Sequence, residues 1–484
     1  MNKHSKQAAL AVGMLAALTL AVETKAQTAD PLLNALIKKG VLTEKEAKEV
    51  QTEVKDAKEA VTAPKFLQVN SNFKNLELYG DVRVRYEYRS AQTSSGDTLA
   101  RERERYAYRL GLKGDLFEDF YYGMRLDSSA NSRSTWVTFG DEKIAGGGAS
   151  SSAGSGPSGK GNDGIFIGQA YAGWHPTEWL DLTLGRMPNP LYTTSMVFDP
   201  DINPEGAAER VKFTTGKLEL FGNFGQFVYQ AVDPANPAPG VYGGVANLSD
   251  SFLLAWQLGA KYQVNKDISV KMGPALYNYT GHGQNSGFNG VFVGQGAAGA
   301  NINGFGNFID NETGINDLLV FDLPAQVDFR IGHYNARVFG DFAYNINGGQ
   351  RAKAAGAAGA FKAQTGEDKA YQVGFAFGNN VDLVNGAHPK KNTWESRVYW
   401  QHVEQYAVDV NLTDSDFMEG RGNLEGIYTA FSYALSANAI ATVRYGYADR
   451  INKSLGTGGS NLDLPWINPV TKYQVLQLDF TLKF

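Results

Sequence analysis

The amino-acid sequence predicts an all-β fold: a transmembrane antiparallel β-barrel of about sixteen strands, with a short N-terminal helical or coiled-coil segment. The first observation is the end of the chain, residues 473–484, where apolar and polar side chains alternate as in a two-faced strand. The second is that similar stretches recur from residue 75 onward. The third is that short and long links alternate between these stretches.

Composition agrees with sheets joined by tight turns. Aromatic residues make up 12% of the chain, and 55 glycines stand against 16 prolines. The absence of cysteine excludes disulfides and thiolate chemistry, and a formal net charge of −5 is too mild to indicate a nucleic-acid partner.

Residues 1–26 predict a signal peptide. Lys3 and Lys6 precede an uncharged apolar run at residues 8–22, and small residues precede a cleavage point after Ala26. That run is shorter than the roughly 20 residues that a membrane-spanning helix needs, so we expect export and cleavage.

Residues 27–70 predict a periplasmic helical segment. Thr43 and Glu46 form a capping box at the start of a helix. A heptad-like stripe of small apolar residues follows, at Ala47, Val50, Val54, Ala57 and Val61. The stripe is short, so a coiled coil and a solvated amphipathic helix both remain open.

Residues 71–484 predict an outer-membrane barrel. One set of alternate positions carries ladders of Arg, Glu, Asp, Lys and Gln, which must line water. The apolar set therefore faces lipid, and the polar set faces the lumen. The links have the short and long sides of such a barrel, except the one at residues 379–392, which is about a dozen residues long on the short side.

Two stretches carry a family resemblance: "LGRMPNPLYTTSMVFDPDINPEGAA" at 184–208 and "DSDFMEGRGNLEGIYTAFSYAL" at 414–435. With the leader "LLNALIKKGVLTEKEAKEV", they make the mature chain similar to the "putative porin" family of Gram-negative outer membranes. The terminal Phe484 resembles the aromatic signal that the barrel assembly machinery recognises. The resemblance implies a water-filled diffusion channel with no active-site residues, and similarity to general porins implies a homotrimer.

A basic ladder on the first strands is the leading functional candidate. Pairing of the first two strands about residue 95 places Arg85 opposite Arg105 and Glu87 opposite Arg103. A hydrated pore screens such like-charge pairs, although solvated lumen charges without a selectivity role remain an alternative. The candidate pore-lining arginines are Arg83, Arg85, Arg103, Arg105, Arg109 and Arg125.

The loop after the fifth strand is the candidate constriction, because similarity to general porins implies that it folds inward. It carries Asp199, Asp201, Glu205 and Glu209. Acids facing an arginine wall would set up a transverse field, whereas a loop lying over the rim would not. We expect anion preference if the loop stays out, and neutral or cation-leaning behaviour if it folds in.

Other motifs give little indication of function. "GSGPSGKG" at 154–161 lacks the Ser or Thr and the flanking strand and helix of a phosphate-binding loop. The histidines are scattered, so neither a metal site nor a cofactor is expected, and no nucleophile and base cluster indicates an enzyme.

The sequence therefore predicts a porin in the cell outer membrane, with its N-terminal segment in the periplasm, that passes small hydrophilic solutes and ions. A solute-specific channel and a structural or adhesive barrel are the alternatives. Expected partners are outer-membrane lipid, the barrel assembly machinery, two further copies of the chain and a periplasmic partner for the helical segment.

Overall fold

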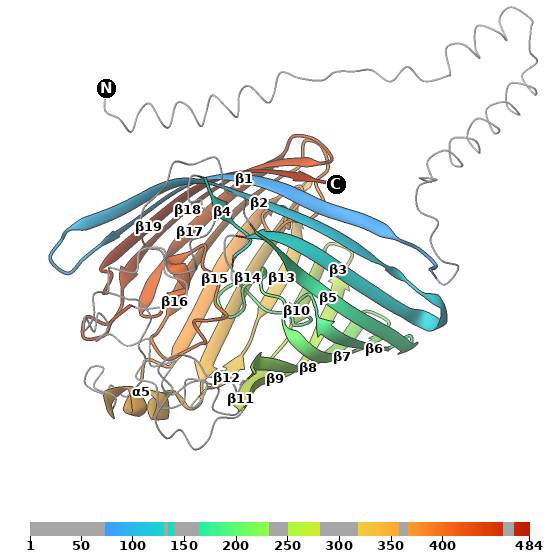
Figure 1. Cartoon of the computed structure of the whole chain (residues 1–484), viewed down its shortest axis with the longest axis horizontal. Coiled ribbons are helices and arrows are strands. Elements are labelled where there is room, and N and C mark those ends of the chain that lie inside the picture. Colours follow the sequence, from blue (N-terminus) through green and yellow to red (C-terminus); the bar gives the residue numbers. More distant parts are fainter. Residues whose placement is uncertain are drawn as a thin grey trace, which may run out of the picture. The chain divides into compact units, whose positions relative to one another are not determined.

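The computed structural model describes residues 73–129, 134–139, 164–231, 250–280, 318–357, 366–457 and 469–484. The chain divides into two units, Met1–Phe73 and Lys74–Phe484. The predicted signal peptide, the predicted helical segment and the glycine-rich stretch at 154–161 lie outside the described residues. The second unit is a β-barrel (Figure 1).

The barrel is built from strand segments of up to 18 residues. They are β1 (Glu77–Gln92), β2 (Thr98–Asp115), β3 (Phe120–Ser129), β4 (Val137–Thr138), β5 (Gly164–Thr177), β6 (Leu180–Arg186), β7 (Glu205–Thr215), β8 (Leu218–Gln230), β9 (Ser251–Asn265), β10 (Ile268–Met272), β11 (Ala275–Thr280), β12 (Leu319–Asp322), β13 (Ala325–Ile331), β14 (Tyr334–Asn345), β15 (Lys369–Gly378), β16 (Trp394–Val403), β17 (Leu424–Ala434), β18 (Ala439–Arg450) and β19 (Lys472–Lys483).

These segments form one closed barrel. Each strand pairs antiparallel with its neighbours, and β19 pairs with β1 from Asp81 opposite Lys483 to Gln92 opposite Lys472. β10 and β11 are two halves of one strand, as are β12 and β13, and the two-residue β4 only extends the wall beside β2. The barrel therefore has sixteen strands, which confirms the predicted all-β antiparallel barrel.

Two prolines account for the split strands. Pro274 separates β10 from β11, and Pro324 separates β12 from β13. Proline has no N–H to donate to a sheet ladder, so both neighbouring strands break at the same level. The Gly273 N–H donates to the Pro324 carbonyl at 3.0 Å across this break, which keeps the wall continuous.

The outer face is apolar, as the alternation predicts. Leu184, Leu258 and Val373 are each more than half exposed on it. Aromatic side chains gather near the short turns: Phe120 stacks on Trp174, and Trp179 stacks on Phe213. Such a girdle is typical of the boundary between lipid and water in outer-membrane barrels.

The lumen is only partly polar, contrary to the expectation from alternation. Charged side chains line β1, β2 and β19, but an apolar core lies inside the barrel along β8 to β12. Phe227, Leu253 and Tyr277 of these strands pack against Met187 and Met196, which come from the segment between β6 and β7. The polar prediction fails here because chain folded into the lumen, not water, covers these strands.

Helices are minor in the described part of the chain. They are α5 (Gly348–Ala357) and the short 3-10 turns η2 (Phe117–Asp119) and η3 (Met418–Gly420). None of the helices described here has the length and apolar character to cross a membrane.

Aromatic rings cover glycines on directly paired strands. Tyr121 lies over Gly173 and Tyr171 lies over Gly123, so that a Cβ built on either glycine would come within 2.3 Å of a ring atom. The ring shields the backbone that glycine leaves bare, and this pairing fixes the register of β3 against β5.

We expect Gly173→Val to destabilise the barrel, because the new side chain must displace the Tyr121 ring. Overpacking of this kind costs about 1 to 3 kcal/mol. The unfolding temperature in detergent, followed by circular dichroism, measures the loss. Gly349→Ala is the control, since its added Cβ meets no atom within 4 Å. Equal unfolding temperatures for both variants would contradict the packing role of the ring.

Candidate functional site

Two long connections fold into the lumen and meet there. We call them L3 (residues 187–204, between β6 and β7) and L7 (residues 404–423, between β16 and β17). The Asp199 N–H donates to the Leu412 carbonyl at 2.6 Å, and the Asp414 N–H donates to the Ser195 carbonyl at 3.1 Å. These backbone bonds join the loops into one partition.

L3 is anchored to the wall formed by β9, β13 and β14. The Tyr192 N–H donates to the Gln257 amide oxygen at 2.8 Å, and the amide nitrogen of Gln257 donates back to the Tyr192 carbonyl at 2.7 Å. The Tyr192 hydroxyl donates to Gln326 at 2.9 Å, and the Thr194 hydroxyl donates to Asp341. L3 is therefore held well inside the barrel.

L7 is anchored on other strands. The Tyr229 hydroxyl of β8 donates to Asp409 at 2.7 Å. Arg89 of β1 donates to the Ser415 carbonyl at 3.0 Å, and Gln477 of β19 donates to Asp416 at 3.0 Å. L7 thus contacts wall strands on both sides of its own strand pair, and the two loops together divide the lumen.

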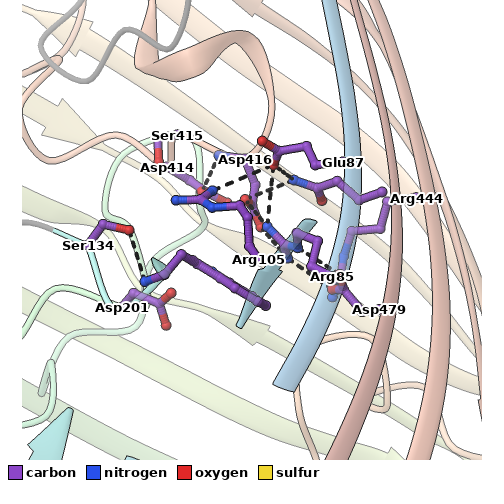
Figure 2. Close-up of polar contacts among 12 residues, drawn as sticks. Arg85, Glu87, Arg105, Ser134, Asp201, Asp414, Ser415, Asp416, Arg444 and Asp479 are labelled. Carbon is purple, nitrogen blue, oxygen red and sulfur yellow. Dashed lines mark hydrogen bonds and ion pairs between the residues drawn. The ribbon is translucent and has the colours of Figure 1, made fainter. Parts of the chain in front are cut away.

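A network of ion pairs fills the space between L7 and the closing strands (Figure 2). Arg85, 2% exposed, donates to Asp479 of β19 at 2.6 Å and to Asp416 of L7 at 2.7 Å. Arg444 contacts the same Asp479. Buried arginines need such partners, because an unpaired buried charge is strongly destabilising.

Glu87 forms the second centre of the network. It is fully buried and accepts from Arg103 at 2.6 Å, Arg89 at 3.0 Å and Gln477 at 3.0 Å. Arg105 lies 3.7 Å from the same carboxylate. One acid on β1 thus gathers arginines from its own strand and from β2.

Arg109 carries the contact to L3. Its guanidinium donates to Asp201 at 2.7 Å. Next to it, the segment 134–139 places Trp136 against the arginine wall, with the Arg85 guanidinium 4.1 Å from the ring centroid. The aromatic face offers these cations a further favourable contact.

The predicted ladder register is confirmed. Arg85 lies opposite Arg105, and Glu87 lies opposite Arg103. Arg83 pairs with Asp81 and Arg125 pairs with Asp127, each at 2.7 Å within one strand. All six arginines project inward, and their role in conduction stays a proposal.

The structure places the four predicted loop acids in two different positions. Asp199 and Asp201 lie in L3 at the junction with L7 and the arginines. Glu205 and Glu209 are not brought there, because β7 begins at Glu205. Glu205 contacts Arg186, and Glu209 lies opposite Leu182 and accepts from Gln226 at 2.9 Å.

Several site residues went unrecognised in the sequence. They are Trp136, Asp414, Asp416, Arg444 and Asp479. The polar parity of the last strand marks Asp479 as a lumen residue, but no local pattern places L7 inside the barrel. The acids were also expected to face the arginines across a gap, whereas Asp201 and Asp416 contact them directly.

Ionisation divides the loop acids into two pairs. Burial and the charge of Asp416 raise the pKa of Asp414 to about 7, while burial and Asp414 raise the pKa of Asp199. Burial also opposes ionisation of Asp416 and Asp201, but Arg85 and Arg109 outweigh it and lower the pKa of each carboxyl. Asp201 and Asp416 are therefore charged at neutral pH, whereas ionisation of Asp414 and Asp199 is opposed.

Charges of both signs meet around this junction. The arginines are Arg83, Arg85, Arg89, Arg103, Arg105, Arg109, Arg125 and Arg444, and the same number of acids faces them: Asp81, Glu87, Asp127, Asp199, Asp201, Asp414, Asp416 and Asp479. Because ionisation of Asp199 and Asp414 is opposed, the net charge of this group depends on pH. Within the described ranges, no group of three or more His, Asp or Glu side chains is placed to hold a metal ion.

A closed barrel with an apolar outer face, inward loops and a charged lumen wall defines a β-barrel channel. The chain belongs to the family described as "Putative porin", whose sequence profile matches residues 93–289 and 315–484. The protein is a porin channel. No curated protein matches its sequence.

Solved porin structures are similar over the barrel. The anion-selective porin from Comamonas acidovorans shares 10% identity and a TM-score of 0.42, over 85% of this chain and 99% of that one. OmpF of Salmonella typhi, in complex with daunomycin, shares 9% identity and a TM-score of 0.44, over 86% of this chain and 100% of that one. OmpT of Vibrio cholerae, in a trimer form, shares 10% identity and a TM-score of 0.38, over 85% of this chain and 99% of that one.

We expect Asp201→Asn to shift ion selectivity toward anions, because it removes a charge at the junction and leaves Arg109 without this partner. One charge within a Debye length of the path should change the permeability ratio by roughly twofold. Reversal potentials across a salt gradient measure it. Glu205→Gln is the matched control, since Glu205 lies outside the junction. An equal shift in both variants would place the constriction elsewhere.

We expect selectivity to move toward cations as pH rises from 5 to 8. Asp414, whose pKa is raised to about 7, ionises in this window and adds negative charge to the junction. Asp414→Asn should remove much of the shift in reversal potential. Glu178→Gln, in the exposed turn between β5 and β6, should keep it. A full shift in Asp414→Asn would mean that another group titrates.

Proposed function

We propose that the protein is an outer-membrane channel for passive diffusion of small hydrophilic solutes and ions. The observation that carries this proposal is the meeting of L3 and L7 against the arginines of β1 and β2. These loops restrict the lumen, and charged side chains surround the junction. A polar solute exchanges water for these groups, whereas an apolar solute gains nothing and must disturb ordered water.

The route for solutes follows the charged side of the lumen. On the other side, Phe227, Leu253 and Tyr277 are covered by L3 side chains, including the fully buried Met196. A dry apolar core leaves no path for ions there. Solutes therefore meet the acids of the two loops, of which Asp201 and Asp416 are partly exposed, while their arginine partners on β1 and β2 lie buried behind them.

A solute-specific channel is the second candidate, and the anchoring of the loops favours it. Tyr192 and Gln257 exchange two hydrogen bonds, and Arg85 is held by two acids. A rigid, charged constriction can select by shape and charge arrangement as well as by size. A wide, mobile opening cannot.

We further propose the assembly and location that the sequence predicts: a cleaved signal peptide at 1–26, a periplasmic segment at 27–70 and a homotrimer in the outer membrane. Phe484 supports recognition by the barrel assembly machinery. Its backbone pairs with Gly80 at 2.9 and 3.1 Å, so the last residue completes the closing seam, and its ring is half exposed on the outer face.

We expect the purified protein, reconstituted in planar bilayers, to give ohmic single-channel currents that close in three equal steps. Each step is one barrel of a trimer, and native mass spectrometry should show the corresponding mass. Liposome swelling with sugars of increasing size then gives the cut-off. Folded protein without ion flow would refute the channel, while a single closing step with a monomer mass would refute only the trimer.

A further inference from the structure

One connection on the short-turn side of the barrel is much longer than the tight turns beside it. Most links at this end are tight, as at residues 266–267 and 332–333, but the link between β15 and β16 covers residues 379–393. We call it the inward link. A short turn closes a hairpin with a few residues, so the additional chain needs another explanation.

The inward link folds against lumen-facing side chains of its own strand pair. Arg397 and Glu395 lie on the face of β16 that also carries Gln401, which contacts Gln372 inside the barrel. The Arg397 guanidinium donates to the Val381 carbonyl at 3.1 Å, and the fully buried Glu395 accepts from the Val384 N–H at 2.7 Å. With its amide oxygen turned toward Arg397, Asn385 accepts from it at 3.1 Å.

The inward link also reaches strands farther around the barrel. Asp382 contacts Arg337 of β14, which Asp328 of β13 holds from the other side. Leu383 is 2% exposed and packs with Ala434 of β17 and Ile440 of β18.

At its far end the link reaches the closing strand. The ammonium group of Lys483, on β19, donates to the Gly386 carbonyl. The contacts thus extend from β14 to β19, along the inner surface of consecutive strands. With neighbouring strands about 4.8 Å apart, the strands that the link contacts span about 24 Å of the wall.

These contacts fix the link inside the barrel. Val381 and Leu383 are buried, and the buried Glu395 and Arg397 have partners in the link or in each other, at 2.8 Å. Withdrawal of the link would expose apolar surface and leave this ion pair without its backbone partners. Buried polar groups that lose their partners are costly, so the inward position is the stable one.

We propose that residues 379–393 form a second constriction at the short-turn end, which acts in series with the L3 and L7 junction and sets the size limit for solutes. This inference rests on the proposed channel function. In a channel with two narrow segments in series, both resist flow, so widening one raises conductance until the other limits it. Solutes that pass the first junction must therefore also pass the inward link.

The chain has no cysteine, so a single introduced thiol can report on this segment. Asn385→Cys places the thiol on an exposed position of the link, near Arg397 in the lumen. A bulky charged methanethiosulfonate reagent should lower single-channel conductance by roughly a third or more, because the adduct narrows the path. Lys266→Cys, in the tight turn between β9 and β10, is the control and should conduct unchanged after labelling.

A shortened variant tests the same point in the opposite direction. Replacing residues 381–391 by Gly-Asn-Gly should raise conductance by about 1.5-fold or more and admit larger sugars in liposome swelling. If this variant does not fold, the labelled Asn385→Cys protein still decides. Unchanged conductance after labelling at position 385, with complete modification, would overturn the second constriction. Absence of current from the unmodified protein would instead refute the channel itself.

Discussion

The pairing of β1 with β19 is the constraint on which the rest of the structure depends. A sheet in lipid must have no open edge, because unpaired backbone groups cannot bond to water there. Closure places Arg85 directly opposite Asp479, residues from the two ends of the barrel sequence. The closing seam is thus also part of the charged lumen wall. A one-residue shift in its register would move Arg85 to the lipid face and remove the partner of Asp416.

Closure also explains why the loops carry acids. A dense row of arginines on one wall repels itself and is stable only with counter-charge. Glu87 supplies part of it from within the wall, and Asp201 and Asp416 supply the rest from L3 and L7. The arginines of the wall thereby stabilise the inward position of the loops, and the loop acids stabilise the arginines in their buried positions. Neither arrangement is stable without the other.

Sequence patterns predicted what depends on near neighbours. The opposition of Glu87 and Arg103 follows from parity and a short turn. Contacts between distant parts of the chain could not be predicted from local patterns. Asp416 contacts Arg85 across 331 positions, and no local pattern indicates that L7 folds inward. The apolar lumen core was not predicted because Phe227 and Leu253 are apolar residues on the lumen parity of their strands, where alternation predicts polar side chains. The inward link was noticed for its length, but only its contacts show where it lies.

Direct pairing changes how the lumen acts on a solute. Charges separated across a gap give an extended transverse field, whereas Arg109 and Asp201 at 2.7 Å form a dipole whose field decays over a short distance. The paired groups therefore hold the constriction in shape more than they steer ions. The groups left to steer are those without an arginine at contact distance, above all Asp199 and Asp414, whose ionisation is opposed by burial and by neighbouring acids. We therefore expect the pH dependence of selectivity to come from the weakest acids of the site, while the paired charges also stabilise the constriction.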